Sequence, residues 1–206
     1  AGAAAGAGKA ELRAALRAAR RALGGEARAA AEAAVCAHLL AAPALRAARA
    51  VGCYAAFDGE VDLAALYAQL AALPRPPRLA FPVHAPGEPL RFFEALAWRA
   101  RAGSYARPVG PEVPLAALDA LLVPGVGFSP SGARLGLGGG FYDRTLAATP
   151  QRTSAPLTFG VAFSLQITEG LPVDPWDLRV AALVTELGWA LRPAPLPNAP
   201  TGRSPI

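Results

Sequence analysis

The sequence predicts a single α/β domain of three layers, in which helices cover both faces of a mostly parallel, Rossmann-like sheet. Short, continuous apolar runs recur along the chain, and buried strands of parallel sheets typically have this pattern. They cover 50–57, 78–83, 120–128, 158–163 and 181–186. Segments typical of helices alternate with these runs, which is the order of βαβ units. A length of 206 residues and a hydrophobic content of 53% suffice for one buried core.

Two helices are predicted ahead of the first strand. The first spans Lys9 to Leu23, because apolar residues recur at helical spacing on one face from Leu12 onward. Gly24 and Gly25 end this helix. An alanine-rich second helix is expected from Glu26 to Ala41, closed by Pro43.

The strands and the remaining helices follow in order. The run 50–57 is followed by "DGEVDLAALYAQL", a loop that leads into a helix. Prolines bound the run 78–83, and 90–96 is a further candidate strand. The run 120–128 is the clearest strand, because it is almost entirely apolar and a glycine-rich loop follows it. Residues 141–149, after this loop, are expected to form a helix.

The ends of the chain differ in composition from the segment between them. We expect the folded domain to cover residues 9–190, preceded by a flexible segment at 1–8. The stretch 191–206 is proline-rich and has no core pattern. It is therefore expected to be a flexible tail.

Composition limits the classes of partner and compartment. A net charge of +5 favours acidic partners such as nucleotides. The basic residues are dispersed and do not alternate with aromatic residues, so we expect no nucleic-acid partner. No uncharged apolar run is long enough to span a membrane. The expected location is cytoplasmic, or organellar if the Ala/Arg-rich N-terminus follows a removed transit peptide.

The cysteines and histidines show no spacing that indicates a metal site. Cys36 and Cys53 have no paired motif, so we expect two buried thiols in a reducing compartment. His38 and His84 have no ligand neighbour at helical spacing and are expected to be structural or surface residues.

The glycine-rich loop "GARLGLGGGFYDR" (132–144) is the main candidate for a functional site. A strand, a glycine-rich turn and a helix form the arrangement that cradles phosphate, because glycines let backbone N–H groups point at an oxyanion. Arg134 could form two hydrogen bonds to phosphate, and Asp143 could hold a Mg²⁺ that bridges phosphate oxygens.

The loop does not match the common nucleotide-binding motifs. Phe141 replaces the last glycine of G-x-G-x-x-G, and the chain has no GK[ST]. A tight structural turn in a glycine-rich protein therefore remains an alternative to phosphate binding.

Several blocks, in order along the chain, resemble the 5-formyltetrahydrofolate cyclo-ligase family. "LLVPGVGFSPSGARLGLGGGFYDR" (121–144) resembles its VPG strand and G-x-RLG-x-G-x-G-[YF]-YDR signature. "KAELR" (9–13) is similar to its K-x-x-LR, and "YAAFDGEVDL" (54–63) to its E-[VI]-[DE] segment. The closing blocks lie within 159–186, from "FGVAFSLQ" to "LVTE". The resemblance thus covers residues 9–186.

The resemblance implies ATP- and Mg²⁺-dependent cyclisation of 5-formyltetrahydrofolate to 5,10-methenyltetrahydrofolate, with release of ADP and phosphate. The partners would be ATP and a small-molecule folate, and we expect a monomer. Arg134 and Asp143 would be catalytic, and Asp143 and Asp177 would hold the metal. ATP would be bound by Lys9, Arg13, Arg134, Leu135, Gly136, Leu137, Gly138, Gly139, Gly140, Phe141 and Tyr142.

The substrate residues implied by the resemblance are Ala55 and Glu60, with Glu60 accepting hydrogen bonds from the pterin. Phe57 and Tyr105 are weaker candidates for stacking on folate, because core packing is the commoner role of such residues. Asp177 could instead be an ordinary helix-start or turn aspartate.

The cations of the first helix share one face. Lys9, Arg13 and Arg17 lie at i, i+4 and i+8, and a docked helix could project all three toward a triphosphate. A solvated basic face is the alternative.

Three residues depart from the pattern of the family. Leu137 replaces a frequent Tyr or Arg, Phe141 replaces a common Tyr, and Ala181 replaces a frequent aspartate. Two other functions stay open, the first because of these departures and the second because fold does not fix function. One is a nucleotide- or folate-binding relative without catalysis, and the other is a different transferase with Glu60 as nucleophile.

Overall fold

The computed structural model describes residues 2–95, 110–147, 155–174 and 177–193. Their centre is an eight-stranded sheet. In spatial order its strands are β10 (Gly188–Leu191), β9 (Ala182–Thr185), β8 (Leu157–Val161), β5 (Ala120–Pro124), β1 (Ala50–Gly52), β2 (Arg78–Val83), β3 (Arg91–Glu94) and β4 (Glu112–Val113). The five strands from β9 to β2 are parallel, whereas β10, β3 and β4 are antiparallel additions at the two edges. The α/β class and the mostly parallel sheet are therefore confirmed.

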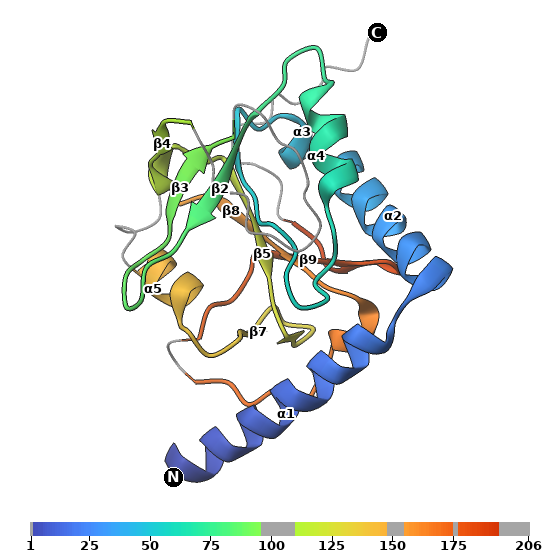
Figure 1. The fold of residues 1–206 in the computed structure, drawn as a ribbon, viewed down its shortest axis with the longest axis vertical. Coiled ribbons are helices and arrows are strands. Elements are labelled where there is room, and N and C mark those ends of the chain that lie inside the picture. Colours follow the sequence, from blue (N-terminus) through green and yellow to red (C-terminus); the bar gives the residue numbers. More distant parts are fainter. Residues whose placement is uncertain (1, 96–109, 148–154, 175–176, 194–206) are drawn as a thin grey trace, which may run out of the picture.

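The two faces of the sheet are covered differently. Side chains alternate across the strands, so that Leu122 packs against one face and Leu121 against the other. The helices α2 (Gly25–Ala41), α3 (Pro43–Arg46) and α4 (Ala64–Ala71) cover the first face. In the described chain, the opposite face is covered by the short α5 (Phe141–Ala147), the 3₁₀ turn η1 (Leu115–Ala117) and the hairpin of β6 (Gly127–Phe128) and β7 (Arg134–Leu135). Figure 1 shows α5 on one side of the sheet and α2 and α4 on the other.

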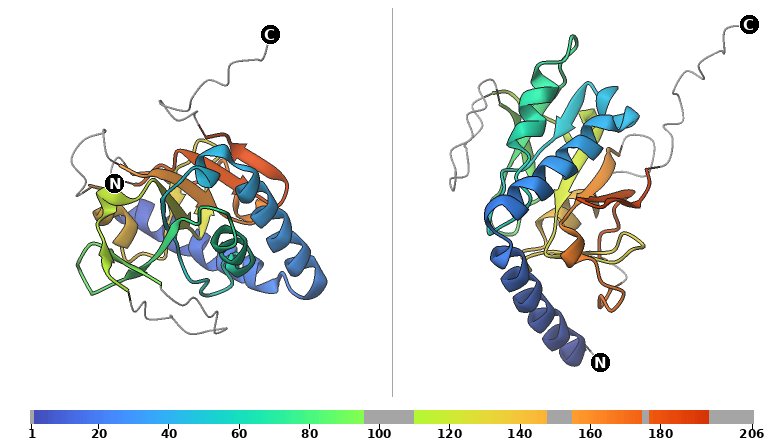
Figure 2. Two further views of the ribbon diagram at one scale, coloured as in Figure 1. Left: turned by 90° about the horizontal axis from the view of Figure 1, so that it is seen from above. Right: turned by 90° about the vertical axis from the view of Figure 1, so that its right-hand side faces the viewer.

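The helix α1 (Gly2–Ala22) lies across the carboxyl end of the sheet. Figures 1 and 2 show it running below the sheet from the N-terminus toward α2. It contacts η2 (Ser164–Gln166), which follows β8, and its Leu16 is buried. The predicted start at Lys9 is wrong by seven residues, because the helix begins at Gly2. Whether residues 1–8 are flexible stays a prediction.

The order of the strands creates a crevice at the carboxyl ends of β1 and β5. The chain passes from β1 through α4 to β2 on one side of β1, and later places β5 on its other side. Loops that leave neighbouring strands in opposite directions open a crevice at this point, and ligands of α/β proteins bind there. The functional loops should therefore follow Gly52 and Pro124.

Two predicted strands are shorter than expected. Of the predicted run 50–57, only Ala50–Gly52 pairs in the sheet. Beyond the run, Asp58 and Gly59 have positive φ angles of 53° and 77°, which are incompatible with an extended strand. The run 120–128 divides at Gly125 into β5 and β6. The short elements α3, β4 and β10 carry too little pattern to be predicted.

The remaining predictions agree with the described elements to within a few residues. The helix α2 begins one residue before its predicted start, and β2 has the predicted bounds. Cys36 and Cys53 are buried free thiols, as expected, and burial raises the pKa of both. The strand β10 ends at Leu191, the first residue of the predicted tail, and residues 194–206 lie outside the described part.

Candidate active site

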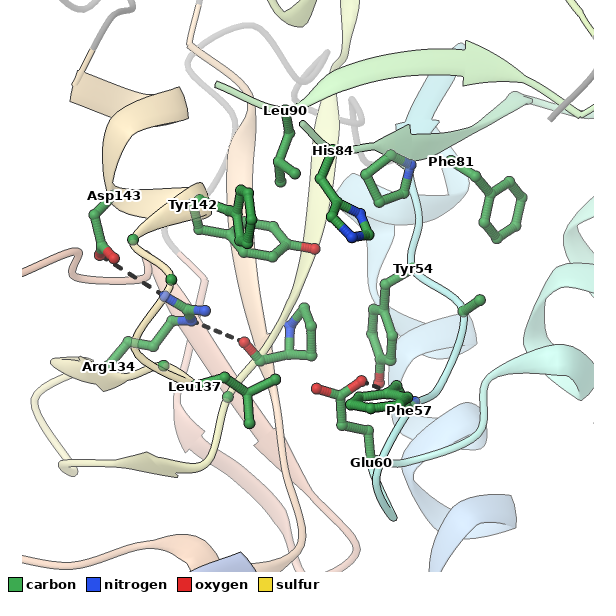
Figure 3. Close-up of a pocket in the computed structure, with 18 residues that line it drawn as sticks. Tyr54, Phe57, Glu60, Phe81, His84, Leu90, Arg134, Leu137, Tyr142 and Asp143 are labelled. Atoms are coloured by element: carbon green, nitrogen blue, oxygen red, sulfur yellow. Dashed lines mark hydrogen bonds and ion pairs between the residues drawn. The ribbon is translucent and has the colours of Figure 1, made fainter. Parts of the chain in front are cut away.

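The glycine-rich loop lies between β7 and α5 and borders two pockets. The first pocket lies in the crevice between the loops that follow β1 and β5, and the second lies toward α1 (Figure 3 shows the first). Among the described residues, four line both pockets: Arg134, Gly136, Gly140 and Asp143. Ligands bound in the two pockets would therefore meet at this loop.

The sequence of the loop follows from its backbone and from the space near Arg134. Gly138 and Gly140 have φ angles of 105° and 64°, a region that side chains strongly disfavour. A Cβ atom on Gly136 would lie 2.9 Å from Nη2 of Arg134. The glycines thus allow both the left-handed turns and the close passage of the chain over a guanidinium group.

Arg134 is a buried cation in the wall between the pockets. Its Nε donates to the carbonyl oxygen of Pro124 at 2.8 Å, and its Nη1 lies 3.7 Å from Oδ1 of Asp143. The guanidinium carbon lies 4.8 Å from the ring centroid of Tyr142. Burial lowers the pKa of Arg134, but a guanidinium remains protonated in proteins. Its contacts leave donors that could bind a phosphate or an oxyanion.

Two cations of α1 reach the second pocket. Arg13 Nε donates to the carbonyl oxygen of Gly136 at 2.9 Å, and Lys9 Nζ lies 2.6 Å from carboxylate oxygens of both Asp174 and Asp177. Burial alone would lower the pKa of Lys9, but these two ion pairs raise it. Both residues line the pocket, and their binding of ATP stays a prediction.

Arg17 does not point toward the second pocket. Its Nε donates to Oδ2 of Asp58 at 2.6 Å, in the loop after β1. The prediction that Lys9, Arg13 and Arg17 act together is therefore wrong for Arg17. Asp58 provides a competing anion that the helical spacing could not reveal.

The carboxylates predicted to hold a metal line the second pocket. Asp143 Oδ1 accepts the N–H of Leu178 at 3.2 Å, whereas Asp177 Oδ2 accepts from Lys9 and from the N–H of Asp174. Among the described residues, no three His, Cys, Asp or Glu side chains form a potential metal cluster. Two carboxylates suit Mg²⁺ better than most metals, because Mg²⁺ keeps waters and substrate phosphates as its other ligands.

The first pocket contains Glu60, and its other lining side chains are mainly apolar and aromatic. Glu60 lies in the loop after β1, and its Oε2 accepts the N–H of Phe57 at 3.0 Å. Burial raises the pKa of Glu60 to about 7, although the hydrogen bond from Phe57 and the charges of Arg20 and Arg134 oppose this shift. Ala55 also lines this pocket, and its contact with the substrate stays a prediction.

Aromatic residues define the shape of the first pocket. Phe57 is 45% exposed at its edge, so the expectation that Phe57 packs in the core is wrong. Leu137 is 46% exposed and lines the same pocket, as do Phe141 and Tyr142. Figure 3 shows Phe57 and Leu137 facing one another from different loops. Tyr105 lies outside the described residues.

Other lining residues were not predicted. His84 was expected to be a structural or surface residue. It is exposed, but it also lines the first pocket, and its ring centroid lies 5.2 Å from that of Phe141. Asp174 lines the second pocket three residues before Asp177. The repeated aspartate in "DPWD" was the available signal for Asp174. The available signal for His84 was its place directly after the predicted strand 78–83, because the parallel pairing of β2 with β1 puts the end of β2 beside the loop after β1.

Ala181 was suspected of weakening the metal site. It lies directly before β9, where its N–H donates to Oγ1 of Thr158 at 2.9 Å, and it is not among the described residues that line either pocket. The departure at Ala181 therefore does not change the two pockets directly.

Comparisons with known proteins give consistent results. The 5-formyltetrahydrofolate cyclo-ligase of Haemophilus influenzae is 33% identical over 159 residues, which cover 72% of this chain and 81% of that protein. The Escherichia coli protein of the same name is 47% identical over 73 residues, a match that spans 35% of this chain and 39% of its own length. Aquifex aeolicus 5,10-methenyltetrahydrofolate synthetase has a TM-score of 0.74 at 30% identity, with coverage of 95% of this chain and 99% of that one. Since the pattern of the 5-formyltetrahydrofolate cyclo-ligase family also matches residues 5–186, the chain belongs to that family.

Proposed function

We propose that this protein catalyses the ATP-dependent cyclisation of 5-formyltetrahydrofolate to 5,10-methenyltetrahydrofolate, with release of ADP and phosphate. The observation that carries this proposal is the position of Arg134, a buried cation that borders both pockets. A phosphoryl group that passes from a nucleotide to a second ligand needs such a cation where the two ligands meet.

The second pocket is assigned to the ATP phosphates. Lys9, Arg13, Arg134 and Arg144 line it, together with backbone of the glycine loop. Guanidinium and ammonium groups suit a triphosphate, because they neutralise charge and donate several hydrogen bonds. The further predicted contacts, from Leu135 to Tyr142, follow the same loop past this pocket into the first one.

The first pocket is assigned to the folate. A flat pterin ring suits a pocket with aromatic walls, and the Glu60 carboxylate can accept hydrogen bonds from adjacent pterin donors. Leu137 and Phe141 supply apolar surface where relatives often have a hydroxyl or a charge. We expect their contribution to folate binding to be packing rather than hydrogen bonding.

The chemistry follows from the poor leaving group of the substrate. The formyl oxygen on N5 attacks the γ-phosphorus and ADP leaves, so that the oxygen becomes part of a phosphate ester. N10 then attacks the activated carbon, the C–O bond breaks, and phosphate and the N10 proton depart. The protein aligns the groups and neutralises charge, and no side-chain nucleophile is needed.

Asp143 and Asp177 would hold Mg²⁺ on the nucleotide side, where the ion supplies charge neutralisation for the phosphates. Asp143 also lies beside Arg134, so its carboxylate would keep this guanidinium oriented toward the transferred group. Lys9 would compete with the metal for Asp177, since both need the same carboxylate.

The test is the ultraviolet absorbance of the methenyl product, measured with purified protein and 5-formyltetrahydrofolate while ATP is omitted and then restored. Product should form only with ATP, and chelation of Mg²⁺ should stop it. Folded protein that binds both ligands without forming product would instead favour a non-catalytic relative. A trapped covalent adduct on Glu60 would favour the different transferase.

The monomeric state and the cytoplasmic location stay predictions. Within the described residues, no helix has the length and apolar character needed to cross a bilayer.

A further inference from the structure

Arginines of α1 and α2 surround the loop that presents Glu60. The side chain of Asp58 in this loop is 4% exposed, and its carboxylate pairs with Arg17, Arg20 and Arg21. Arg28 of α2 donates to the carbonyl oxygen of Gly59 at 3.2 Å. A buried carboxylate with cationic partners restricts where the loop can lie, because moving it away would leave a buried charge uncompensated.

Arg20 differs from the other arginines because its side chain is completely buried. Its Nε donates to the backbone carbonyl of Asp58 at 2.8 Å, and its Nη2 donates to Oδ2 of the same residue at 3.0 Å. Its Nη1 donates to the carbonyl oxygen of Gly125 at 3.0 Å. One guanidinium thus joins the loop after β1 to the end of β5.

The acceptor at Gly125 adjoins the acceptor of Arg134. Arg134 binds the carbonyl of Pro124, so two buried guanidinium groups hold consecutive carbonyls at the end of β5. Gln166 also binds at the end of β5, since its Nε2 donates to the carbonyl oxygen of Gly125 at 2.9 Å. A short connection of hydrogen bonds therefore runs from the Asp58 loop, through Arg20 and β5, to Arg134.

We propose that Arg20 is a positioning residue, which fixes the Phe57–Glu60 loop to the end of β5 and so sets the place of the Glu60 carboxylate relative to Arg134. The effect of Arg20 on folate turnover rests on the proposed function. Its structural content, a loop held by one buried guanidinium, can be tested without turnover. The segment of α1 from Arg13 to Arg20 connects the second pocket to this loop.

Lysine cannot replace Arg20 at this position. A lysine keeps the charge but has a single nitrogen, which cannot donate to Asp58 and Gly125 in the fixed directions of a guanidinium fork. The Arg20→Lys variant therefore separates the geometry from the charge, and Arg20→Met removes both.

The first experiment compares Michaelis constants. Arg20→Lys should raise the KM for 5-formyltetrahydrofolate roughly tenfold, as expected for the loss of one charge-assisted hydrogen bond, and should change the KM for ATP less than about twofold. Arg49→Lys is the matched control, because Arg49 is 90% exposed and pairs with Asp119 at the other end of β5. An unchanged folate KM, or equal rises of both constants, would overturn the inference.

The second experiment reads the pH profile of kcat/KM for folate. The charged groups around Glu60 include Arg20 from α1, Arg28 from α2, Arg134 from β7 and Asp58 from its own loop. The titratable His84, Tyr54, Tyr142 and Asp143 line the same pocket. Arg20→Met removes a cation that favours the carboxylate, so the limb near pH 7 should move upward, whereas Arg20→Lys should leave it in place. A limb that stays near pH 7 in Arg20→Met contradicts the role.

Hydrogen exchange provides the readout that is independent of turnover. Arg20→Lys should speed exchange at the amides of Phe57 and Glu60, which are bonded within the loop, without affecting residues 136–140. If Arg20→Met does not fold, Asp58→Asn provides the second test: it should raise the folate KM in the same selective way and, because Asp58 raises the pKa of Glu60, should move the limb near pH 7 downward. Failure of the wild type to form product would refute the proposed function, whereas unchanged exchange in Arg20→Lys would refute this inference.

Discussion

Arg134 is the residue on which the two pockets converge. Replacing it with Ala should lower kcat by about two to three orders of magnitude, because it removes a preorganised cation from the point of phosphoryl transfer. Lys should recover little of this activity, since it cannot bond Pro124 and a phosphate together. Steady-state kinetics would measure the loss of kcat, and circular dichroism would show that the variants remain folded. A near-normal kcat in folded Arg134→Ala would exclude a role of Arg134 in phosphoryl transfer.

The ionisation of a single residue, Glu60, should make the activity depend on pH. Because burial raises the pKa of Glu60 to about 7, kcat/KM for folate should increase with pH through this value as the accepting carboxylate forms. Glu60→Gln should lower kcat/KM and flatten this limb. A profile of Glu60→Gln that keeps the limb would assign it to a group other than Glu60.

The raised pKa of Glu60 also has a consequence for stability. A carboxyl whose pKa is higher in the folded state binds its proton more tightly there than in the unfolded chain, where 4.5 is its ordinary value. The contribution of Glu60 to stability therefore decreases as pH rises from about 4.5 to about 7. Relative to wild type, Glu60→Gln should become more stable over this range in urea unfolding, and a constant difference between the two would contradict the raised pKa.

At the scale of elements, the glycine loop requires left-handed backbone for its function. Gly138→Ala should destabilise the fold by about 1 kcal/mol, because an L-residue is strained at a φ of 105°, and should also raise the KM for ATP. Gly87→Ala is the matched control: Gly87 has a φ of 80°, and a Cβ there, as at Gly138, meets no atom within 4 Å. Both variants should lose stability in urea, but only Gly138→Ala should alter ATP kinetics; equal ATP kinetics would mean that the loop acts only as a turn.

At the scale of the whole molecule, ligand binding should stabilise the fold. ATP at about one hundred times its Kd should add about 2.7 kcal/mol to the free energy of unfolding, because only the folded chain brings α1 and the glycine loop together. Arg13→Ala should weaken this effect, since Arg13 lines the second pocket and binds Gly136. Thermal melts with ATP, 5-formyltetrahydrofolate or neither would test this, and a nucleotide shift unaffected by Arg13→Ala would place ATP elsewhere.

The sequence by itself determined the class of fold and the position of the glycine loop. Parallel strands are buried on both faces, so their apolar runs are visible without any knowledge of their neighbours. The positive φ angles at Gly138 and Gly140 are local requirements of the backbone, and the sequence reveals them because glycine is the residue that meets them most readily. Helical spacing placed Lys9, Arg13 and Arg17 on one face, and the resemblance of residues 9–13 to the family then named Lys9 and Arg13.

Only the tertiary structure decided which side chains meet. The crossing of α1 over the strand ends brings Arg17 and Arg20 to Asp58, about forty residues away in the chain, and no spacing rule contains that contact. The parallel pairing of β2 with β1 likewise places His84 at the first pocket, where its ring meets that of Phe141 from α5. Burial of charges depends on every neighbouring element at once, and for this reason the sequence could name Glu60 but not its pKa, and could not identify Arg20 at all.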